Sequence, residues 1–479
     1  MNRRKFLGAA AAAIPVAPGL LFGAEALSGQ APAPQSAAIQ QAAPTGGEVT
    51  LVPRFGDARD WWCQKRFGMF VHWGLYAIAG WHEQLEWRGG MPRVEFEKRY
   101  FGQWNPKHFD PETWLDLAQS AGMEYICFTT KHHEGFCQWD TKLTDFNVMH
   151  TPYGKDALRQ LADACHRRNF PLCLYYSAVD WHSPLYPNQG RSHELQPQPG
   201  DHPDINQYVD FVRGQVRELC TNFGKISGFW WDMNVTTVKD PSINAMIREL
   251  QPSAVINNRG FDEGDFGTPE RDYDRTWDTP QSFKQRVEAN QSVGMESWGF
   301  RKDEDYYSHR YLTSSIAKYR ARDANYLLNV GPDADGVIPE KAAGILRRIG
   351  AWYKSVLEAF DGAVPASAIT ANRNVLLTRK GNSLYVHLYQ PPEGEEVRLR
   401  PLAIAPQRAV LLNDGRPVEW RLDIAPMEWT DHKPYLRLHS LPVEEFAGTT
   451  MVVRLDFASL EGMGSAAPTV DPARSTAAQ

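Results

Sequence analysis

The sequence predicts a (β/α)8 barrel of the TIM type, followed by a C-terminal antiparallel β-sandwich. Short, nearly continuous apolar runs alternate with helical patterns, as expected for parallel strands that helices cover on both faces. This alternation continues for roughly 300 residues, a length that favours an eight-stranded barrel. After about Pro365 the segments become alternating or β-branched, with turn residues such as Lys380-Gly381-Asn382 between them. That second pattern is typical of an antiparallel sandwich.

The chain begins with a predicted export signal over residues 1–26. Arg3-Arg4 precedes an apolar run from Gly8 to Phe22, and Ala24-Glu25-Ala26 offers a cleavage site of small residues. A twin arginine before a short, Ala-rich segment indicates the twin-arginine export route, and a generic secretory signal is the alternative. The run is too short to cross a membrane comfortably. We therefore expect the mature protein to be periplasmic or secreted, and not in the membrane.

The rest of the chain divides into a linker, two domains and a tail. Residues 27–52 are rich in Ala, Gln, Pro and Gly without apolar periodicity, which predicts a disordered linker, and residues 459–479 predict a disordered tail of the same character. Between them we place the barrel at 53–362 and the sandwich at 363–458. Six barrel strands are expected, at 67–73, 124–130, 171–177, 226–232, 253–258 and 325–330.

Helix signals lie between these strands. Asp110-Pro111 supplies an N-cap and a first-turn proline for a helix that ends near Gly122. Further helices are expected at about 155–169, 204–223 and 339–360. No Gly-x-Gly-x-x-Gly follows the first strand, which argues against a dinucleotide-binding sheet.

Composition narrows the possible partners. The net charge is −6, from 51 basic and 57 acidic residues, and no basic stretch is interleaved with aromatics, so nucleic acid is not expected as a partner. The six cysteines form no Cys-x-x-Cys pair, which indicates buried thiols, with a disulfide possible, and no structural zinc site. The 16 tryptophans suit either a Trp-rich core or platforms for sugar rings.

Polar residues follow the predicted barrel strands at the end where barrel active sites gather. His72 ends the first strand, His132 and His133 the second, Tyr175 lies near the end of the third and Asp232 ends the fourth. Asp232 comes directly after three aromatics, a costly place for a charge, so a function is favoured over a buried structural aspartate. Metal ligation is not expected, because adjacent histidines on an extended strand diverge. Histidines that donate to sugar hydroxyls are the preferred interpretation.

Two long motifs, Lys65–Gly74 and Thr129–Phe136, resemble glycoside hydrolase family 29, the α-L-fucosidases. Shorter motifs, Thr144–Val148, Tyr175-Tyr176-Ser177 and Asn329–Pro332, resemble the same family. The resemblance covers about residues 55–360 and is weaker through the sandwich. It implies the barrel-plus-sandwich architecture, no cofactor and no metal, fucosylated oligosaccharides or glycoconjugates as substrates, and hydrolysis with retention through an aspartate nucleophile.

The resemblance also implies roles for single residues. Asp232 matches the nucleophile, and Arg259 matches an arginine at the rim of the sugar pocket. Glu270, eleven residues beyond Arg259, is favoured as acid/base, and Glu288 is the alternative. The residues that match those holding the sugar hydroxyls are His72, His132, His133 and Tyr175.

The chain departs from the family after the first strand. The family has a compact Glu-Trp there that contacts the sugar, whereas this chain reads Trp81-His82-Glu83-Gln84-Leu85-Glu86-Trp87. Glu86 and Trp87 fit by identity and Glu83 fits by spacing, so this contact stays open.

Three other functions are compatible with parts of the sequence. An α-L-galactosidase of the same mechanism would differ in tolerating one more hydroxyl, which an apolar pocket rejects only weakly. A catalytically dead fucose-binding barrel would lose a carboxylate, and an exported metal-dependent oxidoreductase would need ligands that the spacing does not supply. Linkage, aglycone and oligomeric state are left open by the sequence.

Overall fold

The computed structural model describes residues 52–233, 240–271, 282–283, 285–428, 432–461, 463 and 469–470. The predicted export signal, all but the last residue of the predicted linker, and most of the predicted tail lie outside these residues. In the described part of the chain, no helix has both the length and the apolar character needed to cross a membrane.

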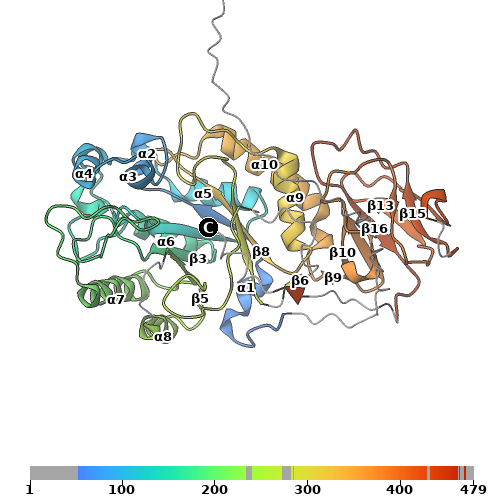
Figure 1. Ribbon diagram of the computed structural model, residues 1–479, viewed down its shortest axis with the longest axis horizontal. Helices are drawn as coiled ribbons and strands as arrows, with labels where there is room; N and C mark the ends of the chain where they lie inside the picture. Colours follow the sequence, from blue (N-terminus) through green and yellow to red (C-terminus); the bar gives the residue numbers. More distant parts are fainter. Residues whose placement is uncertain are drawn as a thin grey trace, which may run out of the picture. The chain divides into compact units, whose positions relative to one another are not determined.

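The larger, N-terminal domain is built on a curled parallel sheet (Figure 1). Seven strands are hydrogen-bonded in the order β5-β4-β3-β2-β1-β8-β7, and every neighbouring pair is parallel. Six of the seven lie at the strand positions that the apolar runs predict. The strands are β1 (Phe67–Val71), β2 (Tyr125–Lys131), β3 (Leu172–Ser177), β4 (Gly228–Asp232), β5 (Val255–Ile256), β7 (Glu288–Ser292) and β8 (Asn325–Val330).

The two edges of this sheet, β5 and β7, are joined by residues 266–270. Phe266 forms a parallel bridge with Asn257 beyond β5, and Glu270 forms one with Asn290 in β7. The segment therefore occupies the sixth of eight strand positions and completes the barrel. The short strand β6 (Ser282–Phe283) lies outside this sheet and pairs with β17 (Thr469–Val470) in the predicted tail.

β7 is the strand that the sequence pattern misses. Four of its five residues are polar, which is compatible with a solvated face or with partners that support the site, but all five are buried. The solvated-face interpretation is therefore wrong.

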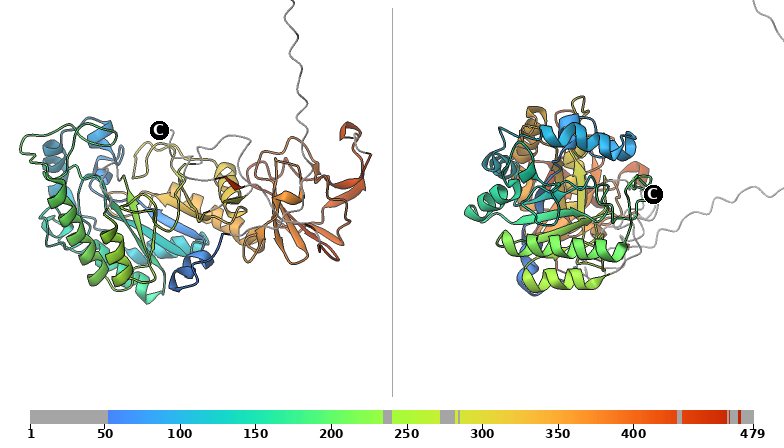
Figure 2. Two further views of the ribbon diagram at one scale, coloured as in Figure 1. Left: turned by 60° about the horizontal axis from the view of Figure 1, so that its bottom comes forward. Right: turned by 90° about the vertical axis from the view of Figure 1, so that its left-hand side faces the viewer.

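Helices form the outer layer around the sheet (Figure 2). Asp110 caps α5 by accepting from the Glu112 N–H at 2.9 Å, with Pro111 in the first turn, as the sequence predicts. The long helices are α5 (Pro111–Ser120), α6 (Ala157–Arg167), α7 (Ile205–Asn222), α8 (Pro241–Leu250), α9 (His309–Arg320) and α10 (Glu340–Val356). Shorter helices are α1 (Trp61–Gln64), α2 (Tyr76–Ala79), α3 (Leu85–Arg88) and α4 (Arg93–Tyr100).

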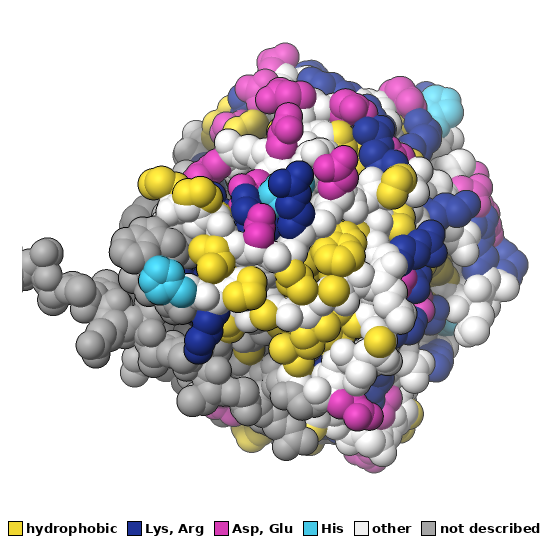
Figure 3. Space-filling model, turned by 90° about the vertical axis from the view of Figure 1, so that its right-hand side faces the viewer, with side chains coloured by type: hydrophobic (Ala, Val, Ile, Leu, Met, Phe, Trp, Pro, Cys, Tyr) yellow, Lys and Arg dark blue, Asp and Glu magenta, His cyan; other side chains and the backbone are white. Residues whose placement is uncertain are grey.

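The C-terminal domain consists of two antiparallel sheets around a separate apolar core. One sheet has the order β13-β16-β11-β10-β9 and the other β12-β15-β14. Figure 3 looks onto the side of the molecule at the right of Figure 1, where apolar side chains gather among charged ones. The strands are β9 (Val364–Pro365), β10 (Leu376–Lys380), β11 (Ser383–His387), β12 (Val397–Arg398), β13 (Arg408–Leu411), β14 (Glu419–Asp423), β15 (Tyr435–His439) and β16 (Val452–Asp456).

All six cysteines are buried free thiols, as the absence of paired spacing indicates.

Candidate active site

The polar residues named from the sequence meet at the carboxyl ends of the barrel strands. The His72 ring lies 5.6 Å from that of His132 and 5.4 Å from that of Tyr175. The His132 and His133 rings are only 4.0 Å apart. The expectation that these two rings diverge is wrong, because β2 ends at Lys131 and the backbone is no longer extended beyond it. Among the residues described, no cluster of three His, Cys, Asp or Glu side chains could hold a metal ion.

One arginine joins two carboxylates in this group. Arg259 donates from Nη1 to Asp232 at 3.1 Å and from Nη2 to Glu270 at 2.9 Å. Since both nitrogens belong to one guanidinium, Asp232 and Glu270 lie close together. Burial opposes the positive charge of Arg259, but Glu270 and Asp232 outweigh it and raise its pKa.

Asp232, the last residue of β4, is held by further donors. The Tyr175 hydroxyl donates to its Oδ2 at 2.7 Å, and the Met233 N–H donates to Oδ1 at 2.9 Å. His133 Nε2 lies 3.9 Å from Oδ2. Burial and the charge of Asp232 raise the pKa of Tyr175, so that hydroxyl keeps its proton and remains a donor. The arrangement suits an ionised aspartate held in one orientation.

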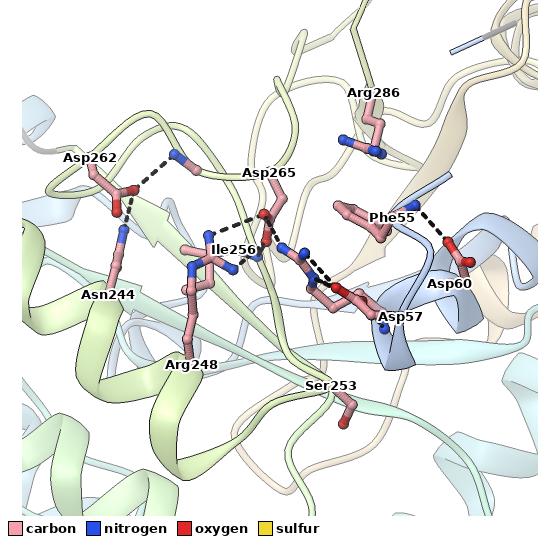
Figure 4. Close-up of polar contacts among 12 residues, drawn as sticks. Phe55, Asp57, Asp60, Asn244, Arg248, Ser253, Ile256, Asp262, Asp265 and Arg286 are labelled. Carbon is pink, nitrogen blue, oxygen red and sulfur yellow. Dashed lines mark hydrogen bonds and ion pairs between the residues drawn. The ribbon is translucent and has the colours of Figure 1, made fainter. Parts of the chain in front are cut away.

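Asp265, directly before the segment that ends at Glu270, is held by several donors (Figure 4). Asp265 accepts from Arg248 at 3.0 Å, from Arg59 at 2.8 Å and from the Ile256 N–H at 2.9 Å. These contacts tie the segment to α8, to the N-terminal region and to β5. The segment then runs along β7 until Glu270 reaches Arg259.

The two carboxylates differ in exposure and share a backbone feature. The Asp232 side chain is 13% exposed and that of Glu270 is 29% exposed. Each is followed by a non-glycine residue with left-handed backbone, Met233 at φ 53° and Arg271 at φ 51°. Such a conformation costs roughly 1 kcal/mol or more and occurs preferentially at functional sites. At both positions the left-handed residue turns the backbone out of its extended course directly after the carboxylate.

Two histidines are fixed in one neutral tautomer by their neighbours. Asn329 donates its amide to the Trp298 carbonyl at 2.7 Å, so its Oδ1 faces His72 and accepts from Nδ1–H at 2.7 Å. Ser177 donates its hydroxyl to the Val179 carbonyl at 2.7 Å and must therefore accept from His133 Nδ1–H, also at 2.7 Å.

These tautomers leave Nε2 of each ring as an acceptor. Burial lowers the pKa of His72 to about 3, with the neighbouring His132 adding to the effect. Burial likewise lowers the pKa of His133. Both rings are therefore neutral near pH 7 and accept hydrogen bonds, where the sequence had suggested donors.

Glu83 lies with the histidines, with its Oε2 3.5 Å from His82 Nδ1. Its Oε2 accepts from the Ser297 hydroxyl at 2.6 Å and from the N–H groups of Trp298 and Gly299 at 2.9 and 3.1 Å. Burial opposes its charge, but His82 and His132 outweigh that and lower its pKa to about 2. Glu83 thus ties the Trp298 loop to the site, and the Trp298 ring lies 5.4 Å from His72.

Glu86, in the short helix α3, is buried as well. Burial, with Glu134 and Glu97 adding to the effect, raises its pKa, which favours the protonated form. Trp87 does face the site, because it stacks on His193 at 4.3 Å, and the His193 ring lies 6.4 Å from His133. Which of Glu83 and Glu86 contacts the sugar stays a prediction.

Glu288 is not brought into this group. It is the first residue of β7 and pairs with Asn325, the first residue of β8, so it lies at the opposite, amino-terminal end of the barrel. It is buried there among Trp62, Tyr125 and Trp230.

Sequence reasoning missed several residues that shape the site. Asn329 and Ser177 lie inside motifs that were noted, but their effect on histidine tautomers needs the fold. Thr268 accepts from Arg259 Nε at 2.7 Å through its hydroxyl. His193 comes from the long loop after β3, where no periodicity marks it.

The chain is similar to known proteins of one family. A family model described as alpha-L-fucosidase matches residues 54–358, more than half of the chain. The chain is similar to tissue alpha-L-fucosidase of Bos taurus, with 27% identity over 419 residues that cover 81% of this chain and 87% of the bovine protein.

Solved structures give the same likeness. Alpha-L-fucosidase isoenzyme 1 of Paenibacillus thiaminolyticus superimposes with a TM-score of 0.70 and 32% identity, covering 84% of this chain and 99% of that one. A family 29 alpha-L-fucosidase of Bacteroides thetaiotaomicron, solved as a trapped covalent intermediate with 2-fluoro-fucosyl fluoride, has a TM-score of 0.70 and 25% identity, covering 86% of this chain and 98% of that one.

Proposed function

Because this chain belongs to the α-L-fucosidase family, we propose that it is a retaining α-L-fucosidase that hydrolyses terminal α-L-fucosyl residues of glycans. The observation that carries the proposal is the bridge of Asp232, Arg259 and Glu270 at the open end of the barrel, beside neutral histidines. Two carboxylates close together are what double displacement requires.

Asp232 is the nucleophile of the first step. It attacks the anomeric carbon from the β face while Glu270 protonates the departing glycosidic oxygen, and a β-linked glycosyl-enzyme forms. Tyr175 and Arg259 hold the attacking carboxylate in one orientation. Glu270 has the more exposed side chain of the two, which supports its role beside the leaving group.

Arg259 lies between the two carboxylates that act in the two steps. Once Asp232 is esterified, Glu270 acts as the base that takes a proton from the attacking water. The second attack restores the α configuration.

The site offers acceptors for the sugar hydroxyls and aromatic faces for the C–H surface of the sugar. His72 and His133 accept through Nε2, and Glu83 accepts as a carboxylate, so a hydroxyl can donate to each. Trp87 and Trp298 supply aromatic faces for the C–H surface of the sugar.

The test is cleavage of a nitrophenyl glycoside panel by the purified mature protein in the presence of a strong chelator. Nitrophenyl α-L-fucoside should be cleaved, and nitrophenyl α-L-galactoside should be a poorer substrate. Preference for the galactoside would favour the α-L-galactosidase alternative. No turnover of either would favour a binding barrel, and loss of activity that a metal restores would favour a metalloenzyme.

The acid/base role is tested with Glu270→Ala. A dinitrophenyl leaving group departs without protonation, so this variant should keep a fast first step with the activated substrate. It should lose nearly all activity on natural glycans, and added azide should yield the α-fucosyl azide. If Glu270→Ala only weakens binding, Glu270 is not the acid/base.

We also propose export by the twin-arginine route, supported by Arg3-Arg4 and by Ala24-Glu25-Ala26. Replacing both arginines by lysine should trap the precursor in the cytoplasm. Normal export of that variant would refute the route.

A further inference from the structure

Glu288 is a buried carboxylate that the proposed mechanism does not use. Its Oε2 accepts from the Tyr125 hydroxyl at 2.7 Å and from Trp62 Nε1 at 3.2 Å, and its Oε1 accepts from Trp230 Nε1 at 3.1 Å. The three donors are neutral. Burying a carboxylate in an apolar barrel interior costs free energy, so a role for Glu288 is expected.

The surroundings of Glu288 raise that cost. Burial raises the pKa of Glu288 to about 7, although the three hydrogen bonds act in the opposite direction. The other titratable groups facing it are Tyr125 and Cys127 from β2 and Cys173 from β3. Burial raises the pKa of each, so all three are neutral.

Trp230 contacts both Glu288 and the side chains that hold the nucleophile, Asp232. Its indole N–H bonds Glu288, while its ring stacks on Tyr175 with centroids 5.8 Å apart and an interplanar angle of 16°. The Arg259 guanidinium lies 4.8 Å above the same ring. Tyr175 and Arg259 both donate to Asp232.

Trp62 contacts both Glu288 and the segment that carries the second carboxylate, Glu270. Its ring stacks on Phe266 at 5.0 Å, and Phe266 opens the segment that ends at Glu270. This second route has one more step than the first, because the backbone of the segment separates Phe266 from Glu270.

We propose that Glu288 is a positioning residue that fixes the Trp230 indole from below, so that its ring supports Arg259 and Tyr175 against Asp232. The proposal rests on the proposed function, because it concerns the geometry of that nucleophile. The indole N–H can only donate, and Glu288 is the acceptor that fixes the rotation of the ring within its plane.

Glu288→Gln keeps the side-chain volume but cannot accept all three hydrogen bonds. An amide has one accepting atom for three donors, so it must turn an N–H toward Trp230 or toward Trp62. We expect kcat for α-L-fucoside to fall about 10- to 100-fold with KM changed less than about twofold, because small misplacement of a reacting group acts on the chemical step. Trp230→Phe, which keeps a ring but lacks the N–H, should lower kcat similarly.

A double-mutant cycle separates this role from general damage to the core. If Glu288 acts through Trp230, the double variant should be no slower than the slower single variant. Tyr125→Phe is the matched control, because it removes a donor to Glu288 Oε2 while Trp230 bonds Oε1, and its kcat should stay within about threefold of wild type. Effects of Glu288→Gln and Trp230→Phe that multiply, or a Tyr125→Phe variant as slow as Glu288→Gln, would overturn the proposal.

A readout without activity keeps the test independent of the proposed function. In protein with 15N-labelled tryptophan, the Trp230 indole N–H signal, assigned by its loss in Trp230→Phe, should shift with pH in wild type and not in Glu288→Gln. If wild type cleaves no fucoside, the proposed function fails while this measurement still decides the contact. A signal that titrates unchanged in Glu288→Gln, or wild-type kcat in Trp230→Phe, refutes the positioning role.

Discussion

At the scale of single residues, the site is defined by which atom of each side chain carries a proton. His72 and His133 present acceptors because Asn329 and Ser177 each have only one way to satisfy their own hydrogen bonds. The residue types can be predicted from the strand ends, but the tautomers cannot, since they depend on contacts between segments far apart in the chain.

Ser177→Ala tests the tautomer of His133. Without an acceptor at Nδ1, the ring can move its proton to Nε2 and donate to Asp232, 3.9 Å away, so that it no longer accepts from the sugar. We expect KM to rise and kcat/KM to fall about tenfold or more, the effect of a lost hydrogen bond to a buried group. Steady-state kinetics on nitrophenyl α-L-fucoside measure this.

Ser183→Ala is the matched control, because Ser183 is also buried in the loop after β3 but bonds the Leu185 N–H instead of a histidine. Unchanged KM in Ser177→Ala, or an equal rise in both variants, would show that the serine does not set the ring.

At the scale of elements, apolar runs predicted six barrel strands, but β7 and the segment 266–270 were not recognised as strands. In β7, Glu288 is bonded to indole N–H groups and Asn290 donates to the Pro269 carbonyl at 3.1 Å, so polar side chains are buried with partners that only the fold supplies. The segment is held by isolated bridges and by Asp265, so it needs no apolar run of its own. Glu270 was found through the family resemblance.

Asp265→Asn tests whether this anchor positions Glu270. The amide can still accept from the Ile256 N–H but loses the charge that faces Arg59 and Arg248. We expect the free energy of unfolding to fall by about 1–3 kcal/mol and kcat/KM to fall about tenfold, because the segment can shift. Urea unfolding and steady-state kinetics give the two values.

Asp57→Asn provides the comparison, since Asp57 also pairs with Arg59 but is far more exposed. An exposed pair contributes little, so both quantities should stay close to wild type. Wild-type kcat/KM in a destabilised Asp265→Asn protein would show that Asp265 stabilises the fold but does not position Glu270.

At the scale of the whole molecule, the sequence predicted both domains because the hydrophobic pattern changes from helical alternation to β alternation near Pro365. The contacts that join them were not predictable, since the hydrophobic pattern does not show which residues pack across the junction. Leu376, Tyr385 and Val452 of the sandwich belong to the core cluster of the barrel, and polar groups add hydrogen bonds. Arg310 of α9 donates to the carbonyls of Leu388 and Gln390 at 2.8 and 2.7 Å, and Trp352 of α10 donates to Thr450 O at 2.8 Å.

Arg310→Met should weaken this junction without changing the site. It leaves sandwich carbonyls without their donor, so the free energy of unfolding should fall by about 2 kcal/mol while kcat stays at the wild-type value. Thermal and urea unfolding measure the loss. Arg347→Ala removes an exposed pair with Glu340 in α10 and should change stability by less than about 0.5 kcal/mol. A fall in kcat for folded Arg310→Met would mean that the sandwich acts on catalysis.

The most direct test of the proposed mechanism uses Asp232→Gly. Removing the nucleophile should lower turnover of nitrophenyl α-L-fucoside by several orders of magnitude, because the covalent route has no substitute. Added azide should restore part of the activity and yield the β-fucosyl azide, since a small anion can attack from the vacated face. The product is identified by its anomeric proton coupling in NMR. An α-fucosyl azide, or activity equal to wild type, would contradict the assignment of Asp232.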